Sequence, residues 1–359
     1  GGAELALKEI TDRISDQKLE FDLITARLDK DLPKEEKIGS INVYRVGWGF
    51  FLDKYLFPFL AFSKAKKMHK QKKYVLVQAI MAFYAGLAAL LFKMKHSEVK
   101  YLLTMQSGDS DFFIFLRTWF WYPFYKKIYT KADHIQVISS FLKERAEKYG
   151  YRGQVDIIPN GVDVENFKPQ EPNKALKDKL GIQEKDKVIL TVSRLVKKNG
   201  VRELIQSMAY LDFPFKLLIL GKGKEENKLR QLTEKLNLKE NILFLGHLDY
   251  KDLPQYYNLA DVFVRPSLSE GLGNVFLEAM ACGVPLVATP VGGINDFLKK
   301  AEGIPCNPQN PQDVALKISQ AVDLKDELRD KLRNLAKENY SWQKISQQME
   351  KIYFKLIHE

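Results

Sequence analysis

The chain has little cysteine, glycine or proline, and each shortage excludes a class of protein. Two cysteines in 359 residues, Cys282 and Cys306, are too few for a disulfide framework, and no zinc-type cysteine spacing occurs, which fits a reducing compartment. The 21 glycines and 14 prolines exclude a collagen-like or low-complexity chain. Because 45% of the residues are hydrophobic, a disordered chain is excluded as well. The length predicts two domains, each with its own core.

The sequence also lacks a secretory leader and a clear membrane span. It opens on Gly1-Gly2-Ala3-Glu4, without a methionine, a basic region or an apolar region, so we expect the natural N-terminus to lie upstream. The uncharged run 74–92 has 19 residues, close to the roughly 20 that a span requires. It contains Gln78, however, and divides into a strand and an Ala/Leu-rich helix. We expect a buried strand–helix unit there, with a single span as the alternative.

Acidic residues are scarce in one stretch, and that stretch holds the whole excess of positive charge. The formal net charge is +11, and residues 51–152 contain 18 basic and 7 acidic side chains. The remainder is nearly balanced, with 8 basic and 10 acidic residues in 1–50 and 30 and 28 in 153–359. A basic region indicates either nucleic acid or an anionic membrane surface as the partner. No nucleic-acid-binding motif is present, so we expect no nucleic acid partner.

Aromatic residues concentrate in the same basic stretch. Lysines are concentrated in residues 64–73, and nine aromatic side chains lie within residues 112–125. Tryptophan and tyrosine beside basic residues suit the interface of an anionic bilayer, where each lysine contributes about 1 kcal/mol. We therefore expect a cytoplasmic protein whose residues 51–152 dock on the inner face of the membrane. The alternatives are a solvated helix face for the lysines and a core or dimer contact for the aromatic residues.

Short β-branched runs alternate with longer helical stretches along the chain. The runs lie at 21–25, 41–46, 74–80, 101–104, 135–138, 155–158, 188–192, 217–220, 242–245, 262–264 and 286–288. This alternation predicts an α/β fold with parallel, doubly wound sheets. The turn-forming cluster Pro159–Asp163 separates two halves, 1–160 and 168–340. A sheet of this kind should begin with a strand that leads into a glycine-rich turn, and here the turn is residue 1. We expect that the first strand is missing; the alternative is a disordered start.

The densest functional signal is the segment 269–280, which follows a predicted strand and opens a helix. In a doubly wound fold, ligands bind at this carboxyl edge of the sheet. Gly271 and Gly273 allow a ligand to approach the backbone, and the free amides of the helix start attract an anion. Glu270 and Glu278 bracket that site, and one carboxylate can accept both vicinal hydroxyls of a ribose. The pattern predicts a diphosphate with a sugar on each side.

A cationic partner for this diphosphate is predicted after the strand 188–192. Arg194 can fork two phosphate oxygens, and Lys198 adds a point charge, whereas Lys197 is expected to be solvated. The sequence Gly221-Lys222-Gly223 is expected to be a tight turn rather than a dinucleotide-binding fingerprint. The five histidines are scattered along the sequence without metal-ligand spacing, so no metal site is expected.

Together these residues resemble the family 4 glycosyltransferases of the GT-B fold, which use nucleotide-sugar donors with retention. The resemblance covers nearly the whole chain. It implies two Rossmann-like doubly wound domains facing a cleft, with 1–160 on the acceptor side, 168–340 binding the donor, and a final helix, 342–359, crossing back onto the first domain. The matching motifs are Glu270-x7-Glu278 with its continuation 279–285, Val291-Gly292-Gly293, Pro159–Asp163, the Gly-Gly-Ala-Glu start and Ser341-Trp342.

The resemblance also implies roles for the charged residues. Glu278 would bind the hydroxyls of the donor ribose, and Glu270 those of the transferred sugar. Arg194 and Lys198 would stabilise the diphosphate as negative charge builds on the leaving group, an electrostatic task that usually dominates such a step.

Backbone groups complete the implied donor site. The amides of Gly273, Asn274 and Val275 would contact the diphosphate, and Gly2 would lie near the donor phosphate and the acceptor. The departing phosphate would accept the proton of the acceptor hydroxyl. The resemblance therefore implies neither a carboxylate base nor a metal or other cofactor.

Two positions depart from the family pattern. A lysine usually stands where this chain has Asn199, so Lys198 would have to serve from the neighbouring position. A histidine often follows the strand 101–104, where this chain has Met105–Asp109; there Gln106 and Asp109 are candidates for contacts with sugar or acceptor, with a plain turn as the alternative. Asp109-Ser110-Asp111 resembles the metal-binding Asp-x-Asp of another glycosyltransferase fold, but a loop among aromatic residues does not favour a metal.

These observations predict a retaining glycosyltransferase. We expect it to move a sugar from a nucleotide diphosphate sugar to a hydroxyl acceptor, a lipid-linked or cell-envelope glycan. The alternative is a degenerate nucleotide-sugar-binding protein without transfer activity, which the departures at Asn199 and Gln106 would explain.

Overall fold

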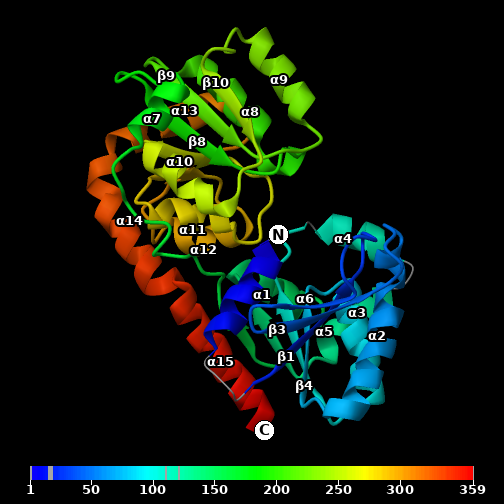
Figure 1. Cartoon of the computed structure of the whole chain (residues 1–359). Coiled ribbons are helices and arrows are strands. Elements are labelled where there is room, and N and C mark those ends of the chain that lie inside the picture. Colours follow the sequence, from blue (N-terminus) through cyan, green and yellow to red (C-terminus); the bar gives the residue numbers. More distant parts are fainter. Residues whose placement is uncertain (1, 15–18, 110, 120–121, 359) are drawn as a thin grey trace. The chain divides into compact units, whose positions relative to one another are not determined.

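The computed structural model describes residues 2–14, 19–109, 111–119 and 122–358. The chain forms two compact units, each with its own sheet system and core (Figure 1). The first unit comprises Gly1–Asn160 and Trp342–Glu359, and the second comprises Gly161–Ser341. Both are α/β structures with mainly parallel strands, as the alternation of runs predicts.

The second unit contains a six-stranded parallel sheet of order β10-β9-β8-β11-β12-β13. Because the strand order changes direction between β8 and β11, the sheet has its switch point there, and in open α/β sheets ligands bind outside the carboxyl ends of the strands at that point. The strands are β8 (Lys187–Val192), β9 (Phe215–Leu220), β10 (Ile242–Gly246), β11 (Val262–Arg265), β12 (Leu286–Ala288) and β13 (Ile304–Pro305).

Helices join these strands and cover the sheet. The α-helices are α7 (Lys174–Lys179), α8 (Val201–Ser207), α9 (Glu226–Lys235), α10 (Leu253–Leu259), α11 (Asn274–Ala281), α12 (Asn295–Leu298), α13 (Pro311–Asp323) and α14 (Lys325–Tyr340). Short 3-10 turns complete the connections: η2 (Lys197–Asn199), η3 (Met208–Tyr210), η4 (Tyr250–Asp252) and η5 (Gly292–Ile294).

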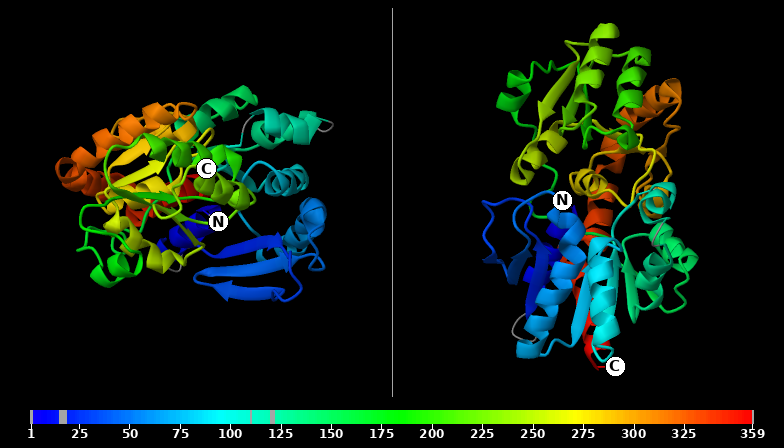
Figure 2. Two further views of the ribbon diagram at one scale, coloured as in Figure 1. Left: turned by 90° about the horizontal axis from the view of Figure 1, so that it is seen from above. Right: turned by 90° about the vertical axis from the view of Figure 1, so that its right-hand side faces the viewer.

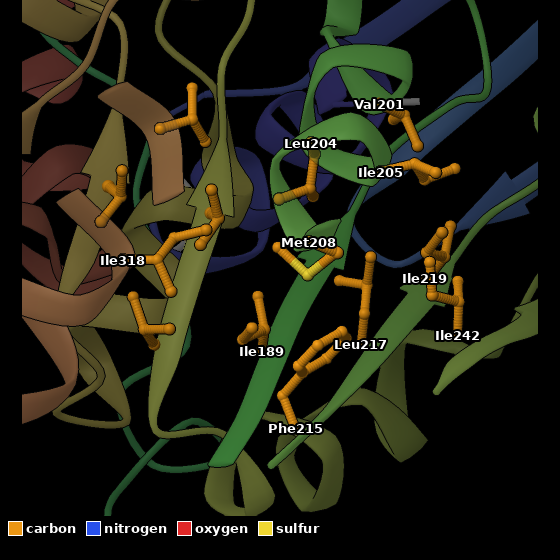
Figure 3. Close-up of a cluster of buried hydrophobic side chains, with 14 of the residues drawn as sticks. Ile189, Val201, Leu204, Ile205, Met208, Phe215, Leu217, Ile219, Ile242 and Ile318 are labelled. Carbon is orange, nitrogen blue, oxygen red and sulfur yellow. The ribbon is translucent and has the colours of Figure 1, made fainter. Parts of the chain in front are cut away.

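A buried aliphatic cluster fixes this sheet to its helices. Leu204 and Ile205 of α8 point toward Ile189 of β8 and Leu217 of β9, and Ile318 of α13 lies in the same cluster (Figure 3). Burying one such side chain contributes about 1.5–3 kcal/mol, so this face of the sheet is a rigid platform for the loops that leave β8 and β11.

The first unit contains two sheets. Three strands form one sheet of order β1-β3-β2, with β1 and β3 parallel and β2 antiparallel; they lie side by side in the left view of Figure 2. Four parallel strands form the other, of order β4-β5-β6-β7. The strands are β1 (Phe21–Ala26), β2 (Glu35–Ile38), β3 (Ile41–Val46), β4 (Leu76–Ile80), β5 (Lys100–Met105), β6 (His134–Val137) and β7 (Val155–Ile157).

Seven helices with described bounds accompany these strands. Among them, α1 packs on α15 through Ala6, Ile10, Trp342 and Met349, all buried. The helices are α1 (Gly2–Arg13), α2 (Asp53–Lys72), α3 (Tyr84–Lys95), α4 (Asp111–Thr118), α5 (Tyr122–Thr130), α6 (Ser140–Lys148) and α15 (Trp342–His358).

The two sheets of the first unit face one another across a cavity. Within the described ranges, no strand pairs with the second edge of β1 or with that of β4. Residues of both strands and of α1 line a cavity of about 1100 Å³, and its walls include Phe21, Leu23, Leu76 and Ile80. Neighbouring strands of one sheet lie about 4.8 Å apart, so strands with a cavity between them, such as β1 and β4, belong to separate sheets.

The uncharged run 74–92 is a strand followed by a helix. It divides into β4 and α3, which confirms the expected strand–helix unit. Among the helices of the described residues, none combines the length and the apolar character that crossing a bilayer requires.

Candidate active site

The candidate site of the second unit lies at the switch point of its sheet. The loop after β8 and the loop after β11 emerge from neighbouring strands there and are joined by a hydrogen bond from the Leu268 amide to the Lys198 carbonyl, 2.8 Å long. Gly200 makes this approach possible: its φ is +72°, and a Cβ atom at this position would lie 1.9 Å from the Pro266 carbonyl oxygen. A side chain at residue 200 would therefore push the two loops apart.

The turn after β9 supports the same loop from its other side. Gly221 has φ +129°, and a Cβ there would meet the Ser193 carbonyl oxygen at 1.9 Å. Gly223 is similarly close to the Leu195 carbonyl oxygen, at 2.3 Å. The two glycines of Gly221-Lys222-Gly223 therefore serve close packing of the backbone against the loop after β8.

Arg265, the last residue of β11, organises the polar groups of the site. Its guanidinium donates to Glu270 Oε2 at 2.5 Å and to Asn199 Oδ1 at 3.1 Å. Asn199 in turn donates from its amide to the Arg194 carbonyl at 2.7 Å. Arg265 and Asn199 are both buried. Charge-assisted hydrogen bonds of this kind are strong, and they hold the Glu270 carboxylate in one orientation.

The Glu270 backbone is fixed by the glycine pair of η5. The Gly293 amide donates to the Glu270 carbonyl at 3.3 Å, and the Glu270 carboxylate accepts from the Gly271 amide at 3.0 Å. Gly292 has φ +55°, and a Cβ on it would lie 2.0 Å from the Glu270 carbonyl oxygen. Gly292 is thus required for the close approach that positions Glu270.

Glu278 lies inside helix α11 and is only 5% exposed. The hydroxyl of Tyr257, on α10, donates to Glu278 Oε2 at 2.8 Å. Burial raises the pKa of Glu278 to about 7, while the Tyr257 hydrogen bond and the charge of Arg265 act in the opposite direction. Arg265 therefore interacts with both carboxylates, directly with Glu270 and through its charge with Glu278. The Arg265 Nε atom is buried without a hydrogen-bond partner within the part of the chain that the structure describes.

Helix α11 begins directly after Gly273, in the segment where the sequence predicts a helix start. Gly273 is the N-cap residue with φ +85°, and Asn274 and Val275 form the first turn of this eight-residue helix. The amides of such a turn have no carbonyl partner within the helix. Arg194 is exposed and Lys198 is half-buried, both on the loop after β8. The structure thus brings the predicted donor-binding residues of the second unit to one edge of one sheet.

The first unit holds the remaining predicted residues. Gly2 begins α1. Gln106 follows β5 and lines a small pocket, where its side-chain oxygen lies 3.5 Å from the Asn160 amide nitrogen. Asp109 accepts from the Ser107 hydroxyl at 2.9 Å, and its carbonyl accepts from Arg145 at 2.6 Å.

In the Asp-x-Asp sequence of this unit, the second aspartate forms ion pairs. Asp111 lies 3.0 Å from Arg145 Nε and 2.5 Å from Lys148 Nζ. These two cations neutralise the Asp111 carboxylate. Ser110, between the two aspartates, lies outside the described residues, as do Phe120 and Trp121 of the aromatic run.

Sequence reasoning missed Arg265, Tyr257 and the structural role of Asn199. A signal for Arg265 existed, because a charged residue ends the apolar strand Val262–Val264 at the ligand-binding edge. The sequence marks Asn199 only as a departure from a lysine. The structure shows instead that its amide holds the Arg194 carbonyl and the Arg265 guanidinium. Tyr257 carried no signal, because a tyrosine in a helix is usually part of the core.

Comparisons with known proteins agree with this geometry. Residues 172–339 match the family described as Glycosyl transferases group 1, and residues 1–166 match the family described as Glycosyltransferase Family 4. A GDP-mannose-dependent monoacylated alpha-(1-6)-phosphatidylinositol monomannoside mannosyltransferase of Corynebacterium glutamicum is 35% identical over 192 residues. That match spans half of this chain and half of the relative.

Two solved structures share the fold over the whole chain. Sucrose-phosphate synthase from Thermosynechococcus elongatus superposes with a TM-score of 0.87 at 22% identity, covering 100% of this chain and 94% of the synthase chain. HepE of Anabaena, in complex with UDP and glucose, gives 0.81 at 20% identity, covering 99% and 96%. With both halves matched by glycosyltransferase families and the fold shared throughout, the chain belongs to the GT-B glycosyltransferases and is an enzyme of that family.

Proposed function

We propose that this enzyme transfers a sugar, with retention, from a nucleotide diphosphate sugar to a hydroxyl acceptor and needs no metal. The observation that carries the proposal is the buried Arg265, which joins Glu270 to the loop bearing Arg194 and Lys198 beside the start of α11. A fixed carboxylate next to an anion-binding helix start and two cations is what a diphosphate flanked by two polyhydroxylated groups requires.

Each residue of this site has a separate task in the proposed reaction. The amides of Gly273, Asn274 and Val275, with Arg194 and Lys198, bind the diphosphate and stabilise the charge that develops as it leaves. Glu270 orients the transferred sugar through its hydroxyls. Glu278 accepts the ribose hydroxyls, and its Tyr257 partner leaves one carboxylate oxygen, Oε1, for the ligand.

The donor binding and the transfer step can be separated by one substitution. In Glu270→Gln the shape is kept but the charge-assisted bond to Arg265 is weakened, so we expect kcat to fall by about 10²–10³-fold. Nucleotide affinity should stay within a few-fold, because the nucleotide contacts lie on α11 and the loop after β8. A thermal-shift panel with UDP, GDP and ADP sugars, followed by transfer and donor-hydrolysis assays, makes both measurements.

Two outcomes decide between the proposed enzyme and the alternative. Transfer or donor hydrolysis by the wild type, lost in Glu270→Gln with binding retained, supports the proposal. Saturable nucleotide-sugar binding without either reaction, for every donor tested, would establish a nucleotide-sugar-binding protein instead.

We further propose that the acceptor is lipid-linked and is reached from the cytoplasmic face of an anionic membrane. The relative from Corynebacterium glutamicum is named for a phosphatidylinositol mannoside acceptor. In the first unit, large apolar side chains are exposed around the start of α2, and we call this set the aromatic surface: Trp48, Phe50, Phe51, Leu52, Tyr55, Leu56 and Phe59. Exposed apolar patches of this kind mark interaction sites.

The aromatic surface carries its own positive charge. Lys54 lies 4.9 Å from the ring centre of Tyr55, and Lys30 lies 4.3 Å from that of Phe50. Helix α2 then continues into the basic residues 64–73. Aromatic rings favour the headgroup level of a bilayer, and lysines beside them are attracted to anionic headgroups.

The aromatic run predicted from the sequence adds a second exposed set in the same unit, after β5: Phe112, Phe115, Leu116, Trp119 and Phe124. Tyr55 of α2 contacts Tyr84 of α3 at 6.0 Å between ring centres, and the adjacent Phe83 contacts Tyr125 of α5 at 5.8 Å. These ring contacts connect the starts of the helices that carry the two sets. Co-sedimentation with anionic vesicles at low salt tests the proposal, and absence of binding there would overturn it.

A further inference from the structure

Two histidines and a glutamate of the first unit lie together, far from the candidate active site in sequence. His69 is in the last turn of α2, His96 caps the end of α3, and Glu98 lies in the turn before β5. One ligand atom from each side chain can be chosen so that all three lie within 4.8 Å of one another. The contact between α2 and α3 brings together histidines that lie 27 positions apart in the sequence, a proximity that their spacing in the sequence does not indicate.

His69 is buried and lacks hydrogen bonds from its ring. Its exposed fraction is 8%, and its Nδ1 atom has no partner within the described ranges. Its Nε2 atom lies 3.8 Å from Glu98 Oε1, beyond hydrogen-bond distance. A buried polar group without a partner is costly. The ring nitrogen that faces Glu98 is the other one, Nε2, and it is the atom of His69 that an ion between the three side chains would contact.

Two of the spacings in this cluster are close to those of a tetrahedral metal site. With bonds of about 2.0–2.1 Å, neighbouring ligand atoms around zinc lie about 3.3 Å apart. His96 Nδ1 and Glu98 Oε1 are 3.2 Å apart, and His69 Nε2 and Glu98 Oε1 are 3.8 Å apart. Small side-chain rotations would bring the second distance to the first.

The backbone around the cluster is well fixed. Lys93 donates to the carbonyls of Ser97 and Val99, at 2.9 Å each, and pairs with Asp133 at 2.8 Å. Phe92 packs against both imidazole rings, with ring centres 5.5 Å from His69 and 4.8 Å from His96.

We propose that His69, His96 and Glu98 bind a divalent transition metal ion, for which Zn²⁺ is the best match. Two imidazole nitrogens and one carboxylate oxygen favour zinc over magnesium or calcium, which prefer oxygen ligands alone. The site lies at the amino end of β5, whereas ligands of α/β sheets bind at the carboxyl ends. Its role is structural: the ion ties the end of α2 to the end of α3 and to the turn before β5. This proposal does not depend on the proposed transfer reaction.

The experiment is a titration of the chelator-stripped whole chain with Zn²⁺ by calorimetry, and with Co²⁺ by absorption. We expect one equivalent to bind and the thermal midpoint to rise with the concentration of the ion. His96→Ala and Glu98→Gln should each weaken binding at least about tenfold and reduce the thermal shift accordingly. His69 is left unchanged, because its replacement would also open the packed core.

A matched control separates the site from ordinary surface histidines. His358→Ala, at an exposed position of α15, should bind the ion as the wild type does. The proposal is overturned if the wild type shows no saturable binding, if both cluster variants bind like the wild type, or if His358→Ala weakens binding equally. Nucleotide-sugar binding by the second unit, measured in the same variants, should not change.

Discussion

The two surfaces to which we propose functions are built in opposite ways. In the second unit, the central groups of the proposed donor site are buried, with Arg265 8% exposed and Glu278 5% exposed, and each forms side-chain hydrogen bonds. In the first unit, the aromatic surface leaves Phe51 69% and Phe59 59% exposed, with lysines over neighbouring rings. Tertiary packing fixes the side chains of the first of these surfaces, whereas those of the aromatic surface project into solvent.

This difference predicts how mutations act. A buried polar network contributes to stability only as a complete set, because removing one member leaves the others unpaired. Exposed apolar side chains contribute almost nothing to folding. Changes in the donor site should therefore affect stability and transfer together, and changes in the aromatic surface should affect membrane binding alone.

The largest effect is expected from Arg265→Met. It removes the partner of Glu270 and of Asn199 and leaves a partly buried carboxylate unpaired, so the free energy of unfolding should fall by about 3–5 kcal/mol and transfer should be lost. Denaturant unfolding and a transfer assay measure both. Arg230→Met, which breaks an exposed pair with Glu226, is the control and should cost less than about 1 kcal/mol. Equal effects of the two substitutions would contradict the network.

The next largest effect is a dependence of the free energy of unfolding on pH, which we attribute to Glu278. Its pKa is raised to about 7 in the folded chain from 4.5, so the folded state binds the proton more tightly and stability falls as the pH rises through this window. The loss amounts to about 3 kcal/mol. Unfolding measured at pH 4.5 and pH 7.5 should show it in the wild type and not in Glu278→Gln. The same slope in both proteins would assign the dependence to other groups.

A smaller effect is expected from Gly292→Ala. The new Cβ would collide with the Glu270 carbonyl in a left-handed backbone, at a cost of about 1–3 kcal/mol, and the displaced carboxylate should lower kcat about tenfold or more. Gly181→Ala is matched to it, with φ +62° and no atom within 4 Å of its Cβ. Gly181→Ala should lower the free energy of unfolding through the same left-handed backbone strain and should leave kcat unchanged. A fall in kcat in both variants would mean that stability, and not the position of Glu270, limits transfer.

The smallest effect on stability is expected from the double substitution Phe51→Ser with Phe59→Ser. Unfolding should change by less than about 0.5 kcal/mol, while the fraction bound to anionic vesicles should fall several-fold. Leu316→Ser, exposed in the second unit, should change neither quantity. A loss of stability comparable to that of Gly292→Ala would show that the aromatic surface packs against protein and would contradict the comparison of the two surfaces.

Local patterns determined much of this protein. The alternation of β-branched runs and helical stretches predicts the parallel sheets, because strand and helix preferences depend mainly on residues near in sequence. The segment from Glu270 to Glu278 indicates the site, because strand, loop and helix start follow one another without interruption. The split of the 74–92 run into β4 and α3 was predicted for the same reason.

Only the tertiary structure decided which side chains meet. Arg265 reaches Asn199 because β8 and β11 are neighbours in the sheet, and Tyr257 reaches Glu278 because α10 lies beside α11. His69 and His96 meet because α2 packs on α3, and the aromatic surface is exposed although its composition is that of a core. Such contacts join residues far apart in the chain, and strand order and helix packing fix them, so no local pattern records them.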